Sequence, residues 1–387
     1  MHSPTPQEPL TIRVDGDFEA CSAWWEDLQN GALASPYQGL SWTQSWWRHC
    51  ESRNRGTLRI VSLFHGDAPL AIMPLVVERS LGMNVAYPVG SRHFNWQIPL
   101  WDSVGAARIG AAERNRLMQC IGAAIRADTI VYPNMPESWG GRENPFIAPQ
   151  ATPSPSATYR LDLHPDFEEL ARARRSKKSL SQLRRKRKRL EDATGPVQFH
   201  RAGDAASCRE VLQAAIAQRA ARKLAGGVPS FFDRPGGEAF VRELLEDGCR
   251  YGLRDAPMSA HYLTAGEHIV ATYFGACLNG NYSCFINSFD GAFDSFSPGD
   301  IALHDVIADA CAQGLTGFDL GVGDERYKQA WCDMIQLYES SEAITARGRI
   351  YDRALRFSRD GKRAFKQNRT LWEGWRAVRR VAARAFA

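Results

Sequence analysis

Short apolar runs and longer runs of helical period follow one another along the first part of the chain. Residues 58–79 (LRIVSLFHGDAPLAIMPLVVER) hold two β-rich runs around a Gly66-Asp67 turn signal, so they predict a β-hairpin. Residues 108–127 carry apolar side chains at helical spacing. The apolar run 128–133 predicts a strand directly after this helix.

A stretch rich in Gly, Pro and Ser, from Pro133 to Pro155, predicts a loop after that strand. Residues 157–163 (ATYRLDL) predict one more strand. Helices and strands therefore alternate over about the first 160 residues, as in a layered α/β structure.

The second half of the chain repeats this order of elements. The pattern predicts helices over 205–223, 236–252 and 297–314, three strands within 257–289, and a strand over 315–321. Asn279-Gly280, between the last two of the three strands, is among the strongest short hairpin signals. We expect two similar α+β domains in α/β/α layers, over 10–163 and 164–345, followed by a helical tail over 346–387.

The bulk composition is that of an ordinary globular protein: of the 387 residues, 44% are hydrophobic and 24% are charged. The start MHSPTPQEPL has neither the basic nor the apolar region of a signal peptide. No uncharged apolar stretch approaches the ~20 residues of a transmembrane helix. The nine cysteines form no Cys-x-x-Cys pair and no zinc-spaced set with histidines. We expect a cytoplasmic protein with reduced, mostly buried thiols and no bound metal.

Positive charge is concentrated in two segments, although the formal net charge is only +5. Eleven Lys and Arg and no acid lie between Arg172 and Arg189, within a predicted basic helix over 168–192. Charge runs are usually solvated faces, and a helix that binds nucleic-acid phosphates is the competing interpretation. From Ala346 to the end, thirteen basic residues face three acids, so the remainder of the chain is acidic.

The C-terminal tail is amphipathic as well as basic. Its apolar residues recur at helical spacing: Leu371, Trp372, Trp375, Val378, Ala382 and Phe386. A basic amphipathic helix with tryptophans is typical of a membrane interface, and each cation adds about 1 kcal/mol near anionic lipid. A helix packed on the second domain explains the pattern equally well.

A turn before the helix over 297–314 is suited to an anion. Ser297-Pro298-Gly299 follows a predicted strand, and the helix opens near Asp300. Free backbone N–H groups and the positive dipole end would favour a pyrophosphate there, while an ordinary Pro-Gly helix entrance is the alternative.

The same helix contains a misleading pair. His304 and Asp309 match the spacing of the glycerolipid acyltransferase motif H-x-x-x-x-D. Positions i and i+5 lie about 140° apart on a helix. We therefore do not expect His304 and Asp309 to act together.

Residues 317–331 (GFDLGVGDERYKQAW) end a strand in an unusual way, with two glycines and then a lysine. A strand that ends near Asp319 would deliver the following loop to the sheet edge, close to the helix entrance. Lys328 could there donate to an oxyanion or hold a phosphate, and Tyr327 could donate a proton. A surface loop with an exposed lysine is the alternative.

These stretches together resemble one family. Residues 297–331 are similar to the signature of the BioF2-like/CelD-like acyltransferases, relatives of the FemAB peptidyltransferases within the GNAT superfamily. The shared features are a Pro-Gly helix entrance, a Gly-x-x-x-x-Asp approach strand and a Gly-Asp-x-x-Tyr-Lys turn. Residues 180–195 (LSQLRRKRKRLEDATG) resemble the family's basic helix, and 90–102 (GSRHFNWQIPLWD) its His-x-Asn-x-x-x-Pro-Leu stretch. The resemblance runs from about Trp42 to Leu337.

The resemblance implies a tandem GNAT, FemAB-like fold, with acyl-CoA as co-substrate, an amine as acceptor and no permanently bound cofactor. The chain lacks a clean Arg/Gln-x-x-Gly-x-Gly/Ala pyrophosphate loop, so CoA binding rests on the resemblance. The expected catalytic residues are Lys328, Tyr327, Asp324 and Glu325. The expected CoA contacts are Ser297, Pro298, Gly299 and Asp300. The expected substrate contacts are Asp319, Gly321, Gly323, Asn95, Trp96 and Arg222.

Bacterial ceramide synthesis, which joins an acyl-CoA to a sphingoid-base amine, is among the activities that the family implies. The basic tail suits such a lipid acceptor and peripheral attachment to the inner face of the cytoplasmic membrane. An aminoacyl-tRNA-dependent aminoacyltransferase, with tRNA as partner, is the second hypothesis. A polysaccharide acetyltransferase and a non-catalytic binding protein on a degenerate GNAT scaffold are further alternatives.

Overall fold

The computed structural model describes residues 10–51, 56–91, 93–106, 109–227, 229–323 and 325–367. The chain divides into two compact units. The first contains the residues up to Ser154 together with Gln336–Asp360, and the second contains Pro155–Ile335 together with the described residues from Gly361 onward. Asp324 and the apolar stripe from Leu371 to Phe386 lie outside the described residues.

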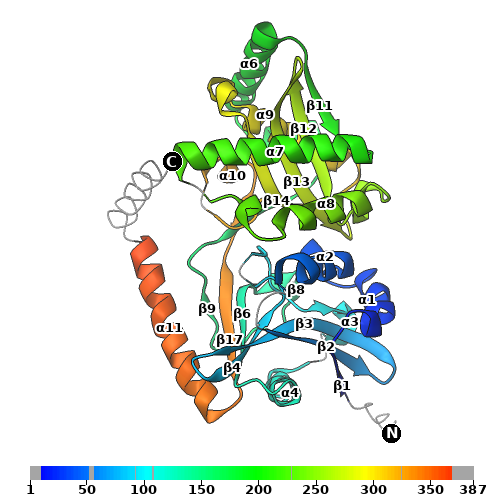
Figure 1. The fold of residues 1–387 in the computed structure, drawn as a ribbon, viewed down its shortest axis with the longest axis vertical. Coiled ribbons are helices and arrows are strands. Elements are labelled where there is room, and N and C mark those ends of the chain that lie inside the picture. The colour runs from blue at the N-terminus through cyan, green and yellow to red at the C-terminus, as the bar shows by residue number, and fades with distance from the viewer. Residues whose placement is uncertain are drawn as a thin grey trace. The chain divides into compact units, whose positions relative to one another are not determined.

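The first unit is built on one large sheet (Figure 1). Its strands are β1 (Leu10–Asp15), β2 (Thr57–His65), β3 (Ala68–Ser80), β4 (Met83–Pro88), β5 (Leu100–Trp101), β6 (Thr129–Pro136), β7 (Ser138–Trp139), β8 (Arg142–Glu143), β9 (Thr152–Pro153) and β17 (Leu337–Ala343). Its helical segments are η1 (Glu19–Cys21), α1 (Ser22–Gln29), η2 (Pro36–Gln38), α2 (Leu40–Trp46), the π-helix η3 (Trp47–Glu51), α3 (Ser103–Ala106), α4 (Ala111–Ala124) and the start of α11 (Ala346–Gln367).

Strand order in this sheet is β1-β2-β3-β4-β6-β17-β9. The predicted hairpin is β2 and β3, and Gly66 supplies the positive φ of its turn. The chain runs from β4 through α4 to β6, and β4 and β6 are parallel. The region predicted as loop from Pro133 to Pro155 is more ordered than expected, because it contains the end of β6 and the short strands β7, β8 and β9.

The second unit also contains one large sheet. Its strands are β10 (Thr158–Asp162), β11 (Val197–Arg201), β12 (Ser259–Ala265), β13 (His268–Leu278), β14 (Asn281–Phe289), β15 (Gly317–Asp319) and β16 (Asp333–Ile335). Its helical segments are α5 (Phe167–Arg174), α6 (Lys177–Thr194), α7 (Ala205–Gly226), η4 (Phe231–Asp233), α8 (Gly237–Gly248), η5 (Leu253–Asp255), η6 (Gly291–Phe296), α9 (Pro298–Ala312) and α10 (Arg326–Gln329).

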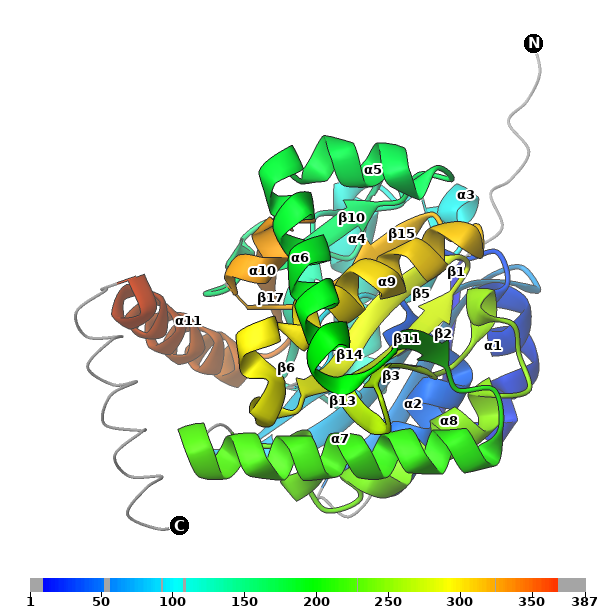
Figure 2. The ribbon, with the colours of Figure 1, turned by 90° about the horizontal axis from the view of Figure 1, so that it is seen from above.

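Strand order in the second sheet is β11-β12-β13-β14-β15-β10-β16. The helices α7 and α8 cover one face of this sheet, and α9 with α5 and α6 covers the other (Figures 1 and 2). The α/β/α layers predicted from the sequence are therefore present in this unit. As in the first sheet, one parallel pair, here β14 and β15, is joined through a helix, here α9.

The predicted domain boundaries differ from the observed units because two strands each pair with a strand of the other predicted domain. Residues 158–162, expected in the first domain, form β10 beside β15 in the second sheet. Residues 337–343, expected in the second domain, form β17 beside β6 in the first sheet. In both sheets the strand next to the parallel pair is distant in sequence from that pair, and in the first unit this strand comes from the separate segment Gln336–Asp360.

The predicted basic helix over 168–192 is two helices. The helix α5 ends at Arg174, Arg175 has extended backbone, and α6 begins after the N-cap Ser176. The Ser176 side chain accepts a hydrogen bond from the backbone N–H of Ser179, which satisfies one of the free donors of the new helix.

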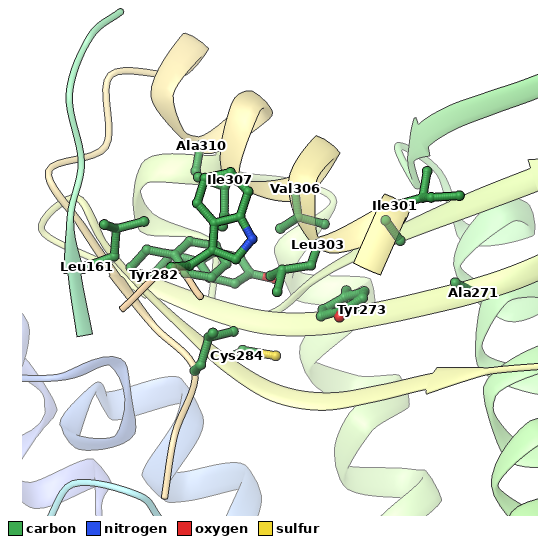
Figure 3. Close-up of a cluster of buried hydrophobic side chains, with 14 of the residues drawn as sticks. Leu161, Ala271, Tyr273, Tyr282, Cys284, Ile301, Leu303, Val306, Ile307 and Ala310 are labelled. Atoms are coloured by element: carbon green, nitrogen blue, oxygen red, sulfur yellow. The ribbon is translucent and has the colours of Figure 1, made fainter. Parts of the chain in front are cut away.

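The core of the second unit lies between the sheet and α9 (Figure 3). Tyr282 and Cys284 project from β14 toward Ile301, Val306 and Ile307 of α9. Because α5 and α6 pack on the outer side of α9, most of that helix is buried. Each large apolar side chain buried in this way contributes about 1.5–3 kcal/mol.

The tail begins as the helix α11, whose first turns contact the first unit rather than the second. The hydroxyl groups of Tyr351 and Tyr87 are 3.0 Å apart, and an Arg347 Nη donates to the carbonyl of Gly82 at 2.6 Å. No helix in the described part of the chain is long and apolar enough to cross a membrane. All nine cysteines are free thiols, six of them buried.

Candidate functional site

The parallel strands β14 and β15 separate within the second sheet. They pair only from Asn281↔Gly317 to Ser283↔Asp319, although β14 continues to Phe289. Beyond Asp319 the chain follows β10 instead. The Leu320 N–H donates to the Tyr159 carbonyl at 2.9 Å, and the Gly323 N–H donates to the Ala157 carbonyl at 3.2 Å. Among the described residues, the second half of β14 therefore has no strand partner on the β15 side, and we call this separation of the two strands the opening beside β14.

Asp319 shapes the turn that follows β15. Its side chain is buried, and Oδ1 accepts hydrogen bonds from Thr158 Oγ1 and from the Gly321 N–H, both at 3.0 Å. Gly321 and Gly323 have φ of 73° and 131°, conformations that favour glycine. Asp319 therefore positions the turn in this structure, and its predicted contact with substrate stays a prediction. Gly321 and Gly323 remain predicted substrate contacts.

Lys328 is buried, so the alternative of an exposed surface lysine is wrong. Only 4% of the residue is exposed. Its ammonium donates to the carbonyls of Gly321 at 3.2 Å and Val322 at 3.1 Å, and lies 2.9 Å from Glu325 Oε2. Three acceptors match the three N–H bonds of an ammonium. The lysine therefore fixes the turn, and the exposed Glu325 carboxylate covers its third donor.

Tyr327 lies beside the lysine and faces β14. Its hydroxyl accepts a hydrogen bond from Asn287 Nδ2 at 3.2 Å, which leaves its own O–H available as a donor. Burial, reinforced by the nearby Cys284, raises the pKa of Tyr327 well above its ordinary value. Burial likewise raises the pKa of Cys284 to about 12. The phenol is therefore neutral at physiological pH and can serve as a proton donor.

The entrance of α9 carries a cation that sequence reasoning did not place there. Ser297 has a left-handed backbone, with φ of 54°, and its Oγ accepts a hydrogen bond from Lys186 of α6 at 2.7 Å. The Asp300 carboxylate is held by Arg175 through bonds of 2.9 and 3.2 Å. Because Arg175 neutralises Asp300, the helix N-terminus with Lys186 remains suited to an anion.

Buried Pro298 and Gly299 complete this turn. The Gly299 carbonyl accepts a hydrogen bond from Tyr273 Oη at 3.0 Å, which ties the turn to β13. A Cβ on Gly299 would lie 3.4 Å from the Phe289 ring, so the turn and the end of β14 are in close contact. The structure thus brings the predicted CoA contacts next to the opening beside β14.

Arg222 lies on α7 and approaches the same place from the other face of the sheet. Its guanidinium carbon is 5.0 Å from the centre of the Phe289 ring. Arg219, three residues earlier on α7, was missed in the sequence. The i, i+3 spacing of two arginines in QRAAR was the available signal, because such residues share a helix face.

Asn95 and Trp96 lie in the first unit. Asn95 Nδ2 donates to the Tyr37 hydroxyl at 2.7 Å. Trp96 is buried and packs edge-on against Trp139, with ring centres 4.7 Å apart. Trp96 is therefore part of the core of the first unit in this structure, and both Asn95 and Trp96 stay predicted substrate contacts.

His304 and Asp309 bond to different partners, as their spacing predicted. His304 Nδ1 lies 3.2 Å from Asp305 Oδ1. Asp309 Oδ2 lies 3.3 Å from Nε2 of the buried His261. Within the described residues, no group of three or more His, Cys, Asp or Glu could hold a metal ion.

Two sheets of the same strand order, each with a parallel pair joined through a helix, define the tandem GNAT fold. Residues 177–329 match the family model described as an acetyltransferase (GNAT) domain, and the protein is an acyltransferase. Lys328 and the α9 entrance lie within the matched residues. No curated protein is similar enough in sequence to count as a relative.

Solved structures resemble the whole chain. FemX has a TM-score of 0.57 at 9% identity, over 85% of this chain and 96% of FemX. The C-terminal domain of a putative lysylphosphatidylglycerol synthetase from Agrobacterium fabrum has 0.52 at 10%, over 89% and 96%. A conserved protein of unknown function from Bacteroides thetaiotaomicron has 0.51 at 11%, over 86% and 99%. At these identities the likeness shows the fold alone.

Proposed function

We propose that the protein transfers an acyl group from acyl-CoA to a primary amine of a lipid or envelope precursor. The observation that carries the proposal is the separation of β14 from β15 between the α9 entrance and the Lys328 turn. An extended thioester can lie along the second half of β14, with its pyrophosphate at Ser297-Pro298-Gly299. The helix N-terminus and Lys186 there supply the positive potential that two phosphates require.

In the proposed reaction the unprotonated amine attacks the thioester carbonyl, and the carbonyl oxygen becomes negative. Backbone N–H groups beside the opening, or Lys328, stabilise this oxyanion, and one such donor typically contributes about 3 kcal/mol. The C–S bond then breaks, and the neutral phenol of Tyr327 donates a proton to the leaving thiolate of CoA. Solvent, or a carboxylate at the turn, takes the proton lost by the amine.

Lys328 can donate directly to the oxyanion only if one of its three present acceptors is displaced. Glu325 is the acceptor that can leave, because its side chain is 56% exposed whereas the two carbonyls belong to the turn. Substrate binding that displaces Glu325 would turn Lys328 from a structural cation into an oxyanion donor. Asp324, between Gly323 and Glu325 in the sequence, stays a predicted participant.

The more specific hypothesis is ceramide-like synthesis, with a sphingoid base as acceptor. The basic amphipathic tail supports an acceptor that resides in a membrane. Purified protein should release CoA from long-chain acyl-CoA in the presence of sphinganine, with the N-acylated product identified by mass spectrometry. Transfer to sugar hydroxyls instead would favour a polysaccharide acetyltransferase, and no transfer to any acceptor with no CoA binding would favour a binding protein.

A second candidate is an aminoacyl-tRNA-dependent aminoacyltransferase, and the exposed cations of α6 favour it. Lys177, Lys178, Arg184 and Arg185 are exposed and form no ion pair among the described residues. Other cations of this segment are used internally, since Arg174 pairs with Asp333 and Arg187 with Asp305. Nuclease-sensitive co-purification of RNA, together with binding of charged tRNA and not of acyl-CoA, would establish the second candidate in place of the first.

A further inference from the structure

Two arginines of α7 lie near the second half of β14. Arg219 and Arg222 are one helical turn apart and therefore share a face of α7. This helix packs on β13 and β14 and crosses the face of the sheet opposite α9 (Figures 1 and 2). Arg222 lies over the ring of Phe289, and that ring also contacts the Gly299 position at the α9 entrance. The arginine pair thus borders the proposed donor site.

Neither arginine has a hydrogen bond or an ion pair with any residue in the described ranges. Arg219 Nε is buried and has no partner, and both side chains are only partly exposed. Other cations of the second unit form ion pairs. Lys223, next on the helix, lies 3.1 Å from Asp233, and Arg187 lies 2.6 Å from Asp305. Cations that are largely removed from water are normally paired, so two partly buried guanidinium groups without a partner require an explanation.

None of the described groups around Arg219 neutralises its positive charge. Burial lowers the pKa of Arg219 below its ordinary value, and repulsion from Arg222 lowers it further. The other groups that act on Arg219 are Cys284 and Tyr327, which are neutral at physiological pH. The Glu325 carboxylate raises the pKa of Tyr327, but it is paired with Lys328 and not with either arginine. No described acid neutralises the two guanidinium groups.

We propose that Arg219 and Arg222 form a subsite that binds an oxyanion, a phosphate or a carboxylate, carried by a substrate of the transfer reaction. The proposal rests on the proposed function for the identity of the substrates. Guanidinium groups bind such oxyanions through paired, charge-assisted hydrogen bonds. The bound oxyanion would supply the negative charge that no described side chain provides here. It would also give Arg219 Nε a hydrogen-bond partner.

Two sources could present the oxyanion. One is the 3′-phosphate of CoA. The Phe289 ring contacts both Arg222 and the Gly299 position at the α9 entrance, so Arg222 lies close to the proposed pyrophosphate site. The other is an acidic group on the amine acceptor, because Arg219 lies near Tyr327 at the predicted reaction centre. In that case the acceptor would be a phosphorylated amine or an amino acid, and not a sphingoid base, which has no acidic group.

Phenylglyoxal labelling followed by peptide mass spectrometry tests the subsite without requiring turnover. Inorganic phosphate should slow the labelling of Arg219 and Arg222 relative to chloride at equal ionic strength, while Arg209, exposed at the other end of α7, serves as internal control. Protection by CoA but not by dephospho-CoA assigns the donor phosphate. Protection by phosphoethanolamine but not by ethanolamine, with CoA and dephospho-CoA equivalent, assigns the acceptor. Equal labelling with phosphate, CoA, phosphoethanolamine and chloride overturns the subsite.

Methionine variants separate binding from structure. Arg219→Met and Arg222→Met should each weaken binding of the protecting ligand by roughly 10- to 100-fold, the loss expected for one charged hydrogen bond. The melting temperature should stay the same or rise, because a half-buried, unpaired cation is removed. Arg209→Met should change neither property, and Arg222→Lys should keep part of the affinity that Arg222→Met loses. Unchanged binding, or a large loss of stability in Arg219→Met, overturns the proposal.

These outcomes are distinct from those that test the proposed function. A protein that protects both arginines with phosphate but transfers no acyl group retains the subsite and loses the function. A protein that acylates amines with unaltered KM in both methionine variants retains the function and loses the subsite.

Discussion

The ammonium of Lys328 lies 3.2 Å from the carbonyl oxygen of Gly321, across the turn that follows β15. The same group holds the Val322 carbonyl and Glu325. We predict that Lys328→Ala lowers kcat by roughly 10²–10³, because both the turn and a potential oxyanion donor are lost. The free energy of unfolding should fall by about 1–3 kcal/mol, since buried carbonyls lose their donor. Steady-state kinetics and urea denaturation measure the two effects.

Glu325→Gln is the matched control for this lysine. It removes the ion pair but leaves both carbonyl contacts, so the turn should persist and the melting temperature should change little. If Glu325 must leave for Lys328 to act, this variant should keep or increase kcat. Normal turnover by a folded Lys328→Ala protein would show that the lysine has no role in the reaction.

Lys186 should contribute to donor binding. Its ammonium lies 2.7 Å from Ser297 Oγ at the entrance of α9, where a pyrophosphate would bind. Lys186→Met is expected to weaken CoA binding about 10-fold in isothermal titration, with a smaller effect at high salt because salt screens the attraction. Lys188→Met is the matched control, because Lys188 is engaged with Glu191 and Asp192 on an exposed face. Equal CoA affinity in both variants would argue against a donor site at this entrance.

Elements with strong local signals were predictable from the sequence. The β13–β14 turn at Asn279-Gly280 has φ of 50° and 72°, the backbone that this dipeptide favours. The helix α9 follows its Pro-Gly entrance and ends before Gly314. In each case neighbouring residues alone determine the conformation.

Long-range pairings were not predictable in the same way. The strand β10 pairs with β15, about 160 residues further along the chain, and β17 pairs with β6. A short strand carries no mark of its partner, so β10 was expected in the first domain and the residues of β17 in the second. The burial of Lys328 and the unpaired state of Arg219 are likewise tertiary properties, because they depend on carbonyls and acids brought close by the fold.

Cys208 and Cys249 should form a disulfide under mild oxidation. Their sulfur atoms are 3.0 Å apart, and both line a cavity of about 200 Å³. Hydrogen peroxide would oxidise the two thiols to one disulfide and be reduced to water. Burial, with the neighbouring Cys249, raises the pKa of Cys208 to about 12, so the thiol is protonated at neutral pH and oxidation should accelerate as pH rises.

Thiol titration in denaturant should fall from nine to seven, and peptide mapping should locate the new bond. Cys208→Ser and Cys249→Ser should each prevent it, whereas Cys120→Ser, at an exposed site, should not. Retention of both thiols after oxidation at high pH would show that the two sulfurs cannot reach disulfide geometry.

Arg114 should be the cation of the first unit whose replacement lowers the stability of the protein most. Its Nη1 lies 2.7 Å from Glu342 of β17, and Nη2 donates to the Phe146 carbonyl at 3.2 Å. Both side chains are largely buried, so Arg114→Ala leaves a carboxylate without its partner and should cost about 3–5 kcal/mol in urea denaturation. The double variant Arg114→Met/Glu342→Met should recover much of this loss. A loss below about 1 kcal/mol in the single variant would mean that water replaces the pair.

The C-terminal stripe is predicted to bind anionic membrane and to bring the enzyme to its acceptor. In the described part of α11, Tyr351 and Arg347 attach the start of the helix to the first unit, and the stripe with Trp372 and Trp375 follows in the sequence. Burial of that stripe in lipid should stabilise binding by several kcal/mol at about 25 cal/mol per Å². The arginines beside it should add attraction that declines as salt rises.

Liposome flotation of the intact chain and of a chain truncated before Thr370 distinguishes the two interpretations of the tail. The intact chain should float with phosphatidylglycerol vesicles and not with phosphatidylcholine vesicles, and the truncated chain with neither. A variant in which Arg376, Arg379 and Arg380 are changed to Gln keeps the apolar stripe and should lose most of the salt-sensitive part. If the stripe packs against the protein instead, truncation should lower the melting temperature, and the intact and truncated chains should float equally.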